Sequence, residues 1–272
     1  MPELPEVEIA CRKLGPLLEG KRFLHFWTDW PRGLRVFSTG QVERDITGRR
    51  IEKVERLGKA IVLALSGGRV LAFHQKMSGK VLVVPQGMKD KHIHFRFALF
   101  GSKELVLHDV RKFGVVWYGP AGEVKKEPYF ASLGKDALGI SFGEFKKLME
   151  SKKGMLKSLL LRQDIFSGIG NIIADESLWK AGLHPKRRAE SLSVSEIKTL
   201  WKSLQSVLNR SIRLGGSTMR YWLQPDSAPG GYFQKRLVYG RKGKMCLRCK
   251  EIISRTVLAS RGTFICGHCQ RL

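Results

Sequence analysis

The sequence predicts an α+β protein of more than one domain, and three observations lead to this class. Segments rich in β-branched and aromatic residues, typical of strands, fill the chain between residues 21 and 119. Segments with the apolar spacing of helices follow, as far as residue 214. A short module with four of the five cysteines ends the chain. Because one domain usually takes about 100–200 residues, the 272 residues indicate a β-rich domain, a helical domain and a small cysteine module.

The first element expected is a helix close to the N-terminus. Its apolar face recurs every three or four positions, at Leu4, Val7, Cys11, Leu14 and Leu18. Proline and glutamate crowd its first turn, where a missing N–H and a negative charge are both tolerated. The helix is expected to end near Gly15-Pro16 or at Gly20.

About eight strands are expected next, separated by Gly, Pro or charged turns. They cover residues 22–27, 50–57, 60–65, 69–74, 80–84, 92–100, 104–109 and 115–119. This number of short strands predicts a sandwich or a barrel. The first domain is therefore placed at 1–119, and a linker rich in Gly, Pro and Lys at 120–139.

The third region is helical. Helices are expected over 142–150, 155–162, 171–181 and 193–214, and a loop with Gly/Pro clusters over 217–231. The helical domain is placed at 140–235 and the cysteine module at 236–272.

The cysteine module has the spacing C-x2-C-x16-C-x2-C, formed by Cys246, Cys249, Cys266 and Cys269. This spacing is typical of zinc ribbons, in which two tight turns each supply two thiolates. Four thiolates close a tetrahedron, so one structural zinc ion is expected and His268 is not needed as a ligand. The alternatives are a redox dithiol pair or disulfides, which an odd fifth cysteine does not favour. Cys11 is expected to be a small core residue.

The charge is strongly basic: 49 Lys and Arg against 24 Asp and Glu give a net charge of +25. Such a surface attracts phosphate backbones, which predicts nucleic-acid binding, although a ribosome-associated or merely basic protein has the same composition. No apolar stretch of about 18 residues predicts a membrane span, and the first residues lack the pattern of a signal peptide. A cytoplasmic location is therefore expected.

The N-terminus itself is a candidate nucleophile, since signatures such as G-x-S-x-G, a Walker loop or H-E-x-x-H do not occur. Removal of Met1 would expose the secondary amine of Pro2, and an α-amine of pKa about 7.7–8 is partly neutral at pH 7. Such an amine attacks electrophilic carbon and forms an imine, and the adjacent Glu3 has acid–base capacity. By themselves, these two residues are more typical of an ordinary helix start.

Several further residues carry weak signals of their own. Lys59 stands at the entry to an apolar strand, where a solvated lysine is common. Arg261 lies between the two cysteine pairs, at the tip of an expected hairpin, where an arginine either binds phosphate or is simply solvated. The SGIGN turn at 167–171 offers backbone N–H groups to an anion, or is a plain connection. Taken singly, three further residues give no functional signal. Met77 is expected in the core, Arg111 on the surface and Phe113 in the core.

Together, these signals resemble one family, the bacterial formamidopyrimidine-DNA glycosylases, in the superfamily that includes endonuclease VIII. Six motifs carry the resemblance in order: MPELPEVE at 1–8, RLGKAIVL at 56–63, HQKMSGK at 74–80, HDVRKFG at 108–114, SGIGNIIADESLWKAGLHP at 167–185 and GGYFQKRLVYGRKGKMC at 230–246. The motifs span essentially the full length of the chain. The PELPEVE opening is more similar to the formamidopyrimidine branch than to endonuclease VIII. The resemblance implies an N-terminal eight-stranded β-sandwich with flanking helices, a helix-two-turn-helix domain and a four-cysteine zinc β-hairpin finger.

The resemblance also implies the chemistry: a base-excision-repair glycosylase with AP lyase activity that acts on oxidised purines, 8-oxoguanine and formamidopyrimidines, in double-stranded DNA. Pro2 would attack C1′, and the resulting Schiff base would lead to strand cleavage by β,δ-elimination. Glu3 would move protons at the ribose, and Lys59 would bind phosphate and assist the first elimination. Arg261 would hold phosphates around the lesion and serve the second.

DNA-binding roles are implied for six residues: His74, His92, Arg111, Lys152, Asn171 and Tyr239. Met77, Arg111 and Phe113 match the trio that fills the space left by a flipped base. The family further implies a monomer with no nucleotide cofactor and no membrane partner.

Two departures from the family pattern stand out. Gln75 and Lys76 replace the small residues usual before Met77, which adds a charge beside the inserted loop. The 217–232 region, which caps the flipped base in oxopurine enzymes, here contains Arg220, Tyr221, Trp222 and a doubled glycine. Two alternatives therefore stay open: an endonuclease VIII-like preference for oxidised pyrimidines, and a nonenzymatic zinc-finger DNA-binding protein.

Overall fold

A computed structural model describes residues 1–219 and 222–272, so Arg220 and Tyr221 lie outside the described residues. The chain divides into two compact units. The first contains residues 1–131 and 215–231, and the second contains 132–214 and 232–272. Residues 215–231, assigned from the sequence to the helical domain, thus group with the β-rich unit. Within the described part, every helix is too short or too polar to cross a membrane.

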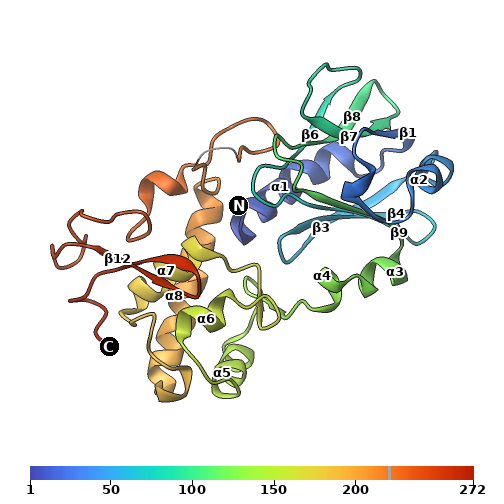
Figure 1. The fold of residues 1–272 in the computed structure, drawn as a ribbon. Helices are drawn as coiled ribbons and strands as arrows, with labels where there is room; N and C mark the ends of the chain where they lie inside the picture. Colours follow the sequence, from blue (N-terminus) through green and yellow to red (C-terminus); the bar gives the residue numbers. More distant parts are fainter. Residues whose placement is uncertain (220–221) are drawn as a thin grey trace. The chain divides into compact units, whose positions relative to one another are not determined.

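The first unit is built around two sheets (Figure 1). One has the order β1-β7-β8-β6 and the other the order β2-β9-β5-β4-β3. The strands are β1 (Phe23–Thr28), β2 (Leu34–Val36), β3 (Ile51–Leu57), β4 (Ala60–Leu65), β5 (Arg69–His74), β6 (Lys80–Pro85), β7 (Ile93–Leu99), β8 (Lys103–His108) and β9 (Val115–Pro120). The helices are α1 (Leu4–Leu18), η1 (Pro31–Gly33), α2 (Thr39–Ile46), α3 (Ala121–Lys126) and α4 (Pro128–Ala131).

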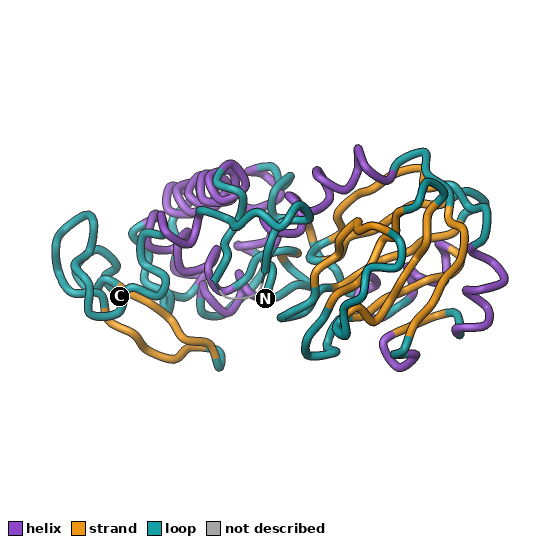
Figure 2. Tube along the Cα trace, turned by 90° about the horizontal axis from the view of Figure 1, so that it is seen from above, coloured by secondary structure: helices purple, strands orange, loops and turns teal. Residues whose placement is uncertain are grey.

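All eight predicted strands are present, and the sheets form the expected sandwich rather than a barrel. Phe73 of β5 packs edge-to-face on Phe97 of β7, with ring centroids 5.7 Å apart, so the two sheets share one core. The apolar face of α1 joins that core, and Cys11 is buried there as expected. Figure 2 shows most strands gathered in this unit and in the C-terminal hairpin.

Strand β2 and helix α2 are among the elements of the first unit that were not predicted. Strand β2 has only three residues, too few to show an alternating pattern, and it pairs in parallel with β9. Helix α2 begins with a capping box in which Ser38 and Gln41 exchange hydrogen bonds across its first turn. The S-x-x-Q spacing at this position was a readable signal for a helix start.

The second unit contains the helical region and the finger. Its elements are β10 (Lys135–Asp136), α5 (Phe142–Glu150), α6 (Leu156–Leu161), β11 (Phe166–Ser167), α7 (Asn171–Ala181), η2 (Ala189–Ser191), α8 (Val194–Arg213), η3 (Tyr232–Lys235), β12 (Ser254–Leu258) and β13 (Arg261–Ile265). Ser141 and Ser193 cap α5 and α8, and Gly182 ends α7 with a φ of 72°. The predicted helices agree with α5–α8 to within a residue at each end. The predicted linker at 120–139 is not bare chain, because α3, α4 and β10 lie within it.

Candidate active site and metal centre

The N-terminal residues are buried rather than frayed. Pro2 and Glu3 are buried, whereas Met1 is exposed. Glu3 is the N-cap of α1, and its backbone N–H donates to Glu6 Oε2 at 2.7 Å. The other oxygen of Glu6 accepts from the backbone N–H of Ser217, also at 2.7 Å. Burial, reinforced by the nearby Glu3 carboxylate, raises the pKa of Glu6 to about 7.

Lys59 lies in the turn between β3 and β4 and is only 6% exposed, so it is not the solvated strand-end lysine considered from the sequence. Its backbone N–H donates to the hydroxyl of Tyr129 at 2.7 Å. The Tyr129 ring meets the His74 ring edge-on, with centroids 5.0 Å apart. Ala60 also pairs with His74 across β4 and β5, so Lys59 and His74 lie at the same sheet edge. Tyr129, at α4, had no signal in the sequence.

Helix α1 is tied to the same turn through Arg56. The Arg56 guanidinium lies 2.9 Å from Glu8 of α1 and donates to the carbonyl of Gly58 at 3.1 Å. Because Gly58 precedes Lys59, this pair fixes the start of α1 against the turn that contains the lysine.

His74 is neutral and its tautomer is defined. Its Nδ1 accepts a hydrogen bond from the backbone N–H of Lys76 at 3.0 Å, which leaves the ring proton on Nε2. Burial, together with the positive charges of Lys76 and Lys59, lowers the pKa of His74 to about 3. His74 therefore offers a neutral N–H donor beside two cations, which suits a phosphate oxygen.

Asp109 joins the two loops that contain the expected space-filling residues. This fully buried carboxylate accepts from Ser78 Oγ at 2.5 Å, and thereby reaches the loop of Met77. It also accepts from backbone N–H groups of its own loop, those of Arg111, Phe113 and Gly114, at 2.7–3.2 Å. Asp109 was quoted within a motif, but its role was missed because its partners are backbone groups.

The side chains held by these loops point outward. Met77 is 41% exposed and Phe113 is 47% exposed, so neither is a core residue. The Arg111 guanidinium lies 4.4 Å from the centroid of the Phe113 ring. His92 is close by in the fold, because its carbonyl accepts from the backbone N–H of Asp109 at 2.8 Å. The trio and His92 thus belong to one region of the first unit.

In the second unit, Arg261 begins strand β13, directly after the tight turn of Ala259 and Ser260, which both have positive φ. Arg261 is exposed. The side-chain amide of Asn171, the first residue of α7, donates to the carbonyl of Gly262 at 3.0 Å. Asn171 therefore lies next to the strand that Arg261 begins.

A buried ion pair fastens this hairpin to the helical region. Lys157 Nζ lies 2.6 Å from Asp175 Oδ1 and also donates to the Gly262 carbonyl and to Thr263 Oγ1. The second Asp175 oxygen accepts from the backbone N–H of Phe264 at 3.0 Å. Neither charged residue of the pair was predicted from the sequence.

Glu176 orders the segment before the finger. It is fully buried and accepts backbone hydrogen bonds from Leu237, Val238 and Tyr239, at 2.7–2.8 Å. The Tyr239 ring in turn packs on Phe264 of β13, with centroids 5.0 Å apart. Lys152 is half-buried in the turn after α5, and the structure gives it no hydrogen bond to the other predicted residues within the described ranges.

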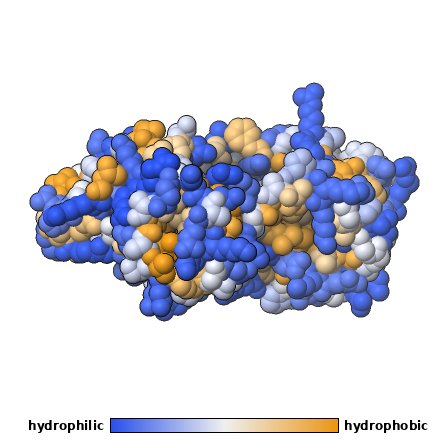
Figure 3. All heavy atoms as spheres, turned by 90° about the horizontal axis from the view of Figure 1, so that it is seen from below, coloured by the Kyte–Doolittle hydropathy of each residue, from blue (hydrophilic) through white to orange (hydrophobic). Residues whose placement is uncertain are grey.

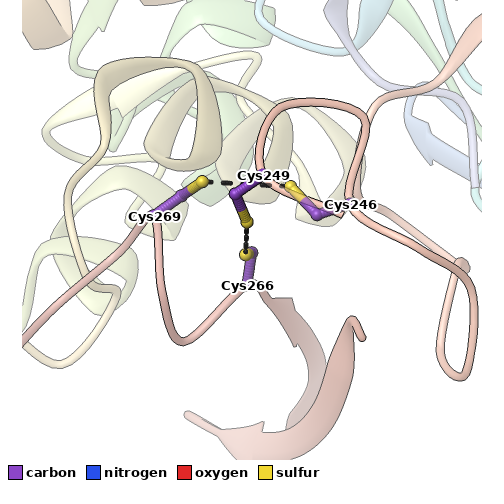
Figure 4. A group of neighbouring side chains, drawn as sticks. All are labelled: Cys246, Cys249, Cys266 and Cys269. Carbon is purple, nitrogen blue, oxygen red and sulfur yellow. Dashed lines mark hydrogen bonds between the residues drawn. The ribbon is translucent and has the colours of Figure 1, made fainter. Parts of the chain in front are cut away.

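The four cysteines of the C-terminal module converge, as Figure 4 shows. Their sulfur atoms all lie within 4.8 Å of one another, with Cys246 and Cys269 3.9 Å apart and Cys249 and Cys266 3.3 Å apart. Four sulfur donors at these separations fit one tetrahedral zinc ion with no open position, which stabilises the fold and leaves no coordination site for chemistry.

Protein-family models match three parts of the chain. They describe the formamidopyrimidine-DNA glycosylase N-terminal domain at residues 1–116, the formamidopyrimidine-DNA glycosylase H2TH domain at 133–222, and a zinc finger found in FPG and IleRS at 243–272. A formamidopyrimidine-DNA glycosylase of Carboxydothermus hydrogenoformans is 37% identical over 272 residues, covering all of both chains. One of Thermus thermophilus is 39% identical, covering 99% of this chain and 98% of the relative.

The chain belongs to the formamidopyrimidine-DNA glycosylase family. Solved members agree with this: the MutM (FPG) protein of Thermus thermophilus superposes with a TM-score of 0.87 at 37% identity, covering 99% of this chain and 98% of that one. A Lactococcus lactis FPG mutant in complex with Fapy-dG DNA gives a TM-score of 0.90 at 30% identity, covering both chains completely. This glycosylase family acts in base-excision repair and combines glycosylase with AP lyase activity. The predicted family, fold, zinc finger and enzyme class are thus confirmed.

Proposed function

We propose that this glycosylase removes oxidised purines, 8-oxoguanine and formamidopyrimidines, from double-stranded DNA, with the amine of Pro2 as its nucleophile. The observation that carries the proposal is the burial of Pro2 and Glu3 at a capped helix start. A chain terminus is usually poorly ordered, whereas this one is held by Glu6. Removal of Met1 places a secondary amine in a low-dielectric site, where the neutral, nucleophilic form is favoured.

Each catalytic residue has its own step in the proposed reaction. The Pro2 nitrogen donates its lone pair to C1′ of the flipped nucleotide, and the base leaves with the electrons of the glycosidic bond and takes up a proton. The Pro2 nitrogen then loses its proton and its lone pair expels the ring oxygen O4′, which takes a proton from Glu3, so that ring opening gives a cationic Schiff base. Loss of a proton from C2′ expels the 3′ phosphate, with Lys59 beside it, and a second elimination expels the 5′ phosphate, served by Arg261.

DNA contacts come from residues of both units. His74 offers its neutral Nε2–H, and the N-terminus of α7 at Asn171 offers backbone N–H groups and a positive dipole end. His92, Lys152 and Tyr239 add further contacts to the DNA backbone. The basic composition supports this proposal, because the net charge is +25. Figure 3 shows many hydrophilic residues on the face drawn, with hydrophobic residues between them.

Met77, Arg111 and Phe113 fill the vacated stack. Exposed apolar side chains on two braced loops suit insertion between bases, and Arg111 has donors for the unpaired base opposite the lesion. The glycosylase acts in the cytoplasm as a monomer and needs no nucleotide cofactor.

Borohydride trapping tests the proposal. Duplexes with one 8-oxoguanine opposite cytosine, and in parallel one 5-hydroxyuracil, are incubated with protein shown by mass to start at Pro2 and to contain zinc. A covalent complex mapped to Pro2, formed faster on 8-oxoguanine, is expected. A faster reaction with 5-hydroxyuracil would instead show the endonuclease VIII-like preference. No adduct on either duplex would exclude both lesions as substrates of a Schiff-base reaction at Pro2.

The matched control is the Pro2→Gly variant together with protein that retains an N-terminal extension. Both should bind the lesion duplex and fail to cleave it. Cleavage that survives in both would exclude Pro2 as the nucleophile.

A further inference from the structure

Lys76 has a backbone conformation that disfavours every residue with a side chain except Asn and Asp. Its φ is 49°, in the left-handed region, and it directly precedes the exposed Met77. A glycine would adopt this conformation without strain. Strain of this kind persists where the surrounding structure imposes it, and it is concentrated at functional sites.

The loop around Lys76 is fixed from both sides. Gln75 is only 2% exposed, and a Cβ on Gly79 would lie 2.6 Å from the Gln75 carbonyl oxygen. The backbone N–H of Lys76 donates to His74 Nδ1 at 3.0 Å, and Asp109 holds Ser78. The backbone path is therefore set by its neighbours, and the Lys76 side chain is not what maintains it.

The charge of Lys76 has no acidic partner in the described part of the chain. Across residues 1–219 and 222–272, no carboxylate forms an ion pair with it. It lies close enough to the imidazole of His74 to disfavour protonation there, as does Lys59. An uncompensated lysine, a second lysine and a neutral imidazole N–H are therefore near one another, beside the residue expected to enter the base stack.

From these observations we infer that Lys76 binds a DNA phosphate next to the point where Met77 is inserted, and thereby adds a contact to those of Lys59 and His74. The inference rests on the proposed function, because it needs DNA to be the ligand of this edge. The backbone at residue 76 is strained because a lysine, and not a glycine, occupies this position of positive φ.

The test compares Lys76→Gly with Ser102→Gly. Ser102 has a φ of 58° in the exposed turn between β7 and β8, at the opposite end of this hairpin from His92 and Arg111, so it serves as the matched control for relief of strain. Both variants should raise the melting temperature, by about 2–4 °C. Only Lys76→Gly should weaken binding.

Binding is measured on a duplex with a tetrahydrofuran abasic analogue, at several salt concentrations. Loss of one phosphate contact lowers the slope of log Kd against log salt by about 0.9, which corresponds to about fivefold weaker binding at 0.15 M salt. Lys76→Arg should retain the wild-type slope. Lys76→Asn, in which the new residue tolerates positive φ, should show the same reduced slope as Lys76→Gly.

Unchanged affinity and slope in Lys76→Gly and Lys76→Asn would overturn the inference. That outcome is distinct from failure of the proposed function, because wild-type protein is tested alongside for trapping on an abasic-site duplex. If the wild type forms no adduct, the proposed function fails; if it forms one while the variants bind like wild type, only the role of Lys76 fails.

Discussion

The Glu6 carboxylate accepts the backbone N–H of Ser217 at 2.7 Å, although the two residues are 211 positions apart. A glutamate in the first turn of α1 therefore holds the start of the 215–231 segment. The same carboxylate accepts the N–H of Glu3, so one buried side chain serves both the N-terminal site and the predicted capping loop.

This arrangement predicts a pH dependence of stability. The pKa of Glu6 is raised from 4.5 to about 7, so the folded state binds a proton that the unfolded chain releases above pH 4.5. The stabilisation is complete below pH 4.5 and is lost as the pH rises through 7. Glu6→Gln lacks this titration. Urea unfolding should show wild type losing about 2–3 kcal/mol relative to the variant between about pH 5 and pH 8. Parallel pH profiles would contradict the assignment.

Asp109 gives a second prediction, because four donors depend on its two oxygens. Asp109→Asn places an amide N–H against backbone N–H groups and should lower the free energy of unfolding by about 2–4 kcal/mol. Ser78→Ala removes a single donor and should cost about 1 kcal/mol. Chemical denaturation measures both. If Ser78→Ala costs as much as Asp109→Asn, the carboxylate is not the common anchor of the two loops.

Phe113 and Phe100 are matched in chemistry and exposure, at 47% and 54% exposed, but only Phe113 is expected to enter DNA. Both Phe→Ala variants should change stability by less than about 0.5 kcal/mol. Phe113→Ala should weaken binding to an abasic-site duplex about tenfold, as expected for loss of one stacking side chain, and Phe100→Ala should not. Equal losses would show that Phe113 has no special place in recognition.

Metal removal provides a fourth prediction. A strong chelator should release about one zinc ion per chain and unfold the finger, because the four thiolates have no other cross-link. DNA binding should be lost with the finger, while hydrogen exchange in β4, β5 and β9 of the first unit stays slow. Retained binding by metal-free protein would show that the finger is dispensable.

The sequence was informative wherever a signal is local. Cysteine spacing was enough to identify the metal ligands, and apolar periodicity located α1. Phe113 is exposed, whereas a phenylalanine taken singly is expected in the core. Only the resemblance to a family predicted an exposed side chain at this position. On local grounds Lys59 was expected to be solvated, whereas it is buried and its backbone N–H donates to Tyr129, 70 positions away.

What could not be predicted is a class of buried charges that bind backbone groups. In the sequence, Asp109, Glu176 and Lys157 look like ordinary surface residues, because many of the groups they bind are backbone N–H and C=O groups that any residue could supply. Such groups carry no residue-specific signal. The contacts that brace the proposed site were therefore invisible in the sequence, although the site residues themselves could be proposed from it.

The return of residues 215–231 to the first unit has a consequence for synthesis on the ribosome. When residue 131 leaves the exit tunnel, the Glu6 carboxylate still lacks one of its two backbone donors. About 100 more residues must be translated before that donor and its segment are available, which takes about 5–20 s at ordinary elongation rates. The nascent β-rich unit thus waits, incomplete, while the helical unit emerges, and an N-terminal fragment released early would be a target for chaperones and proteases.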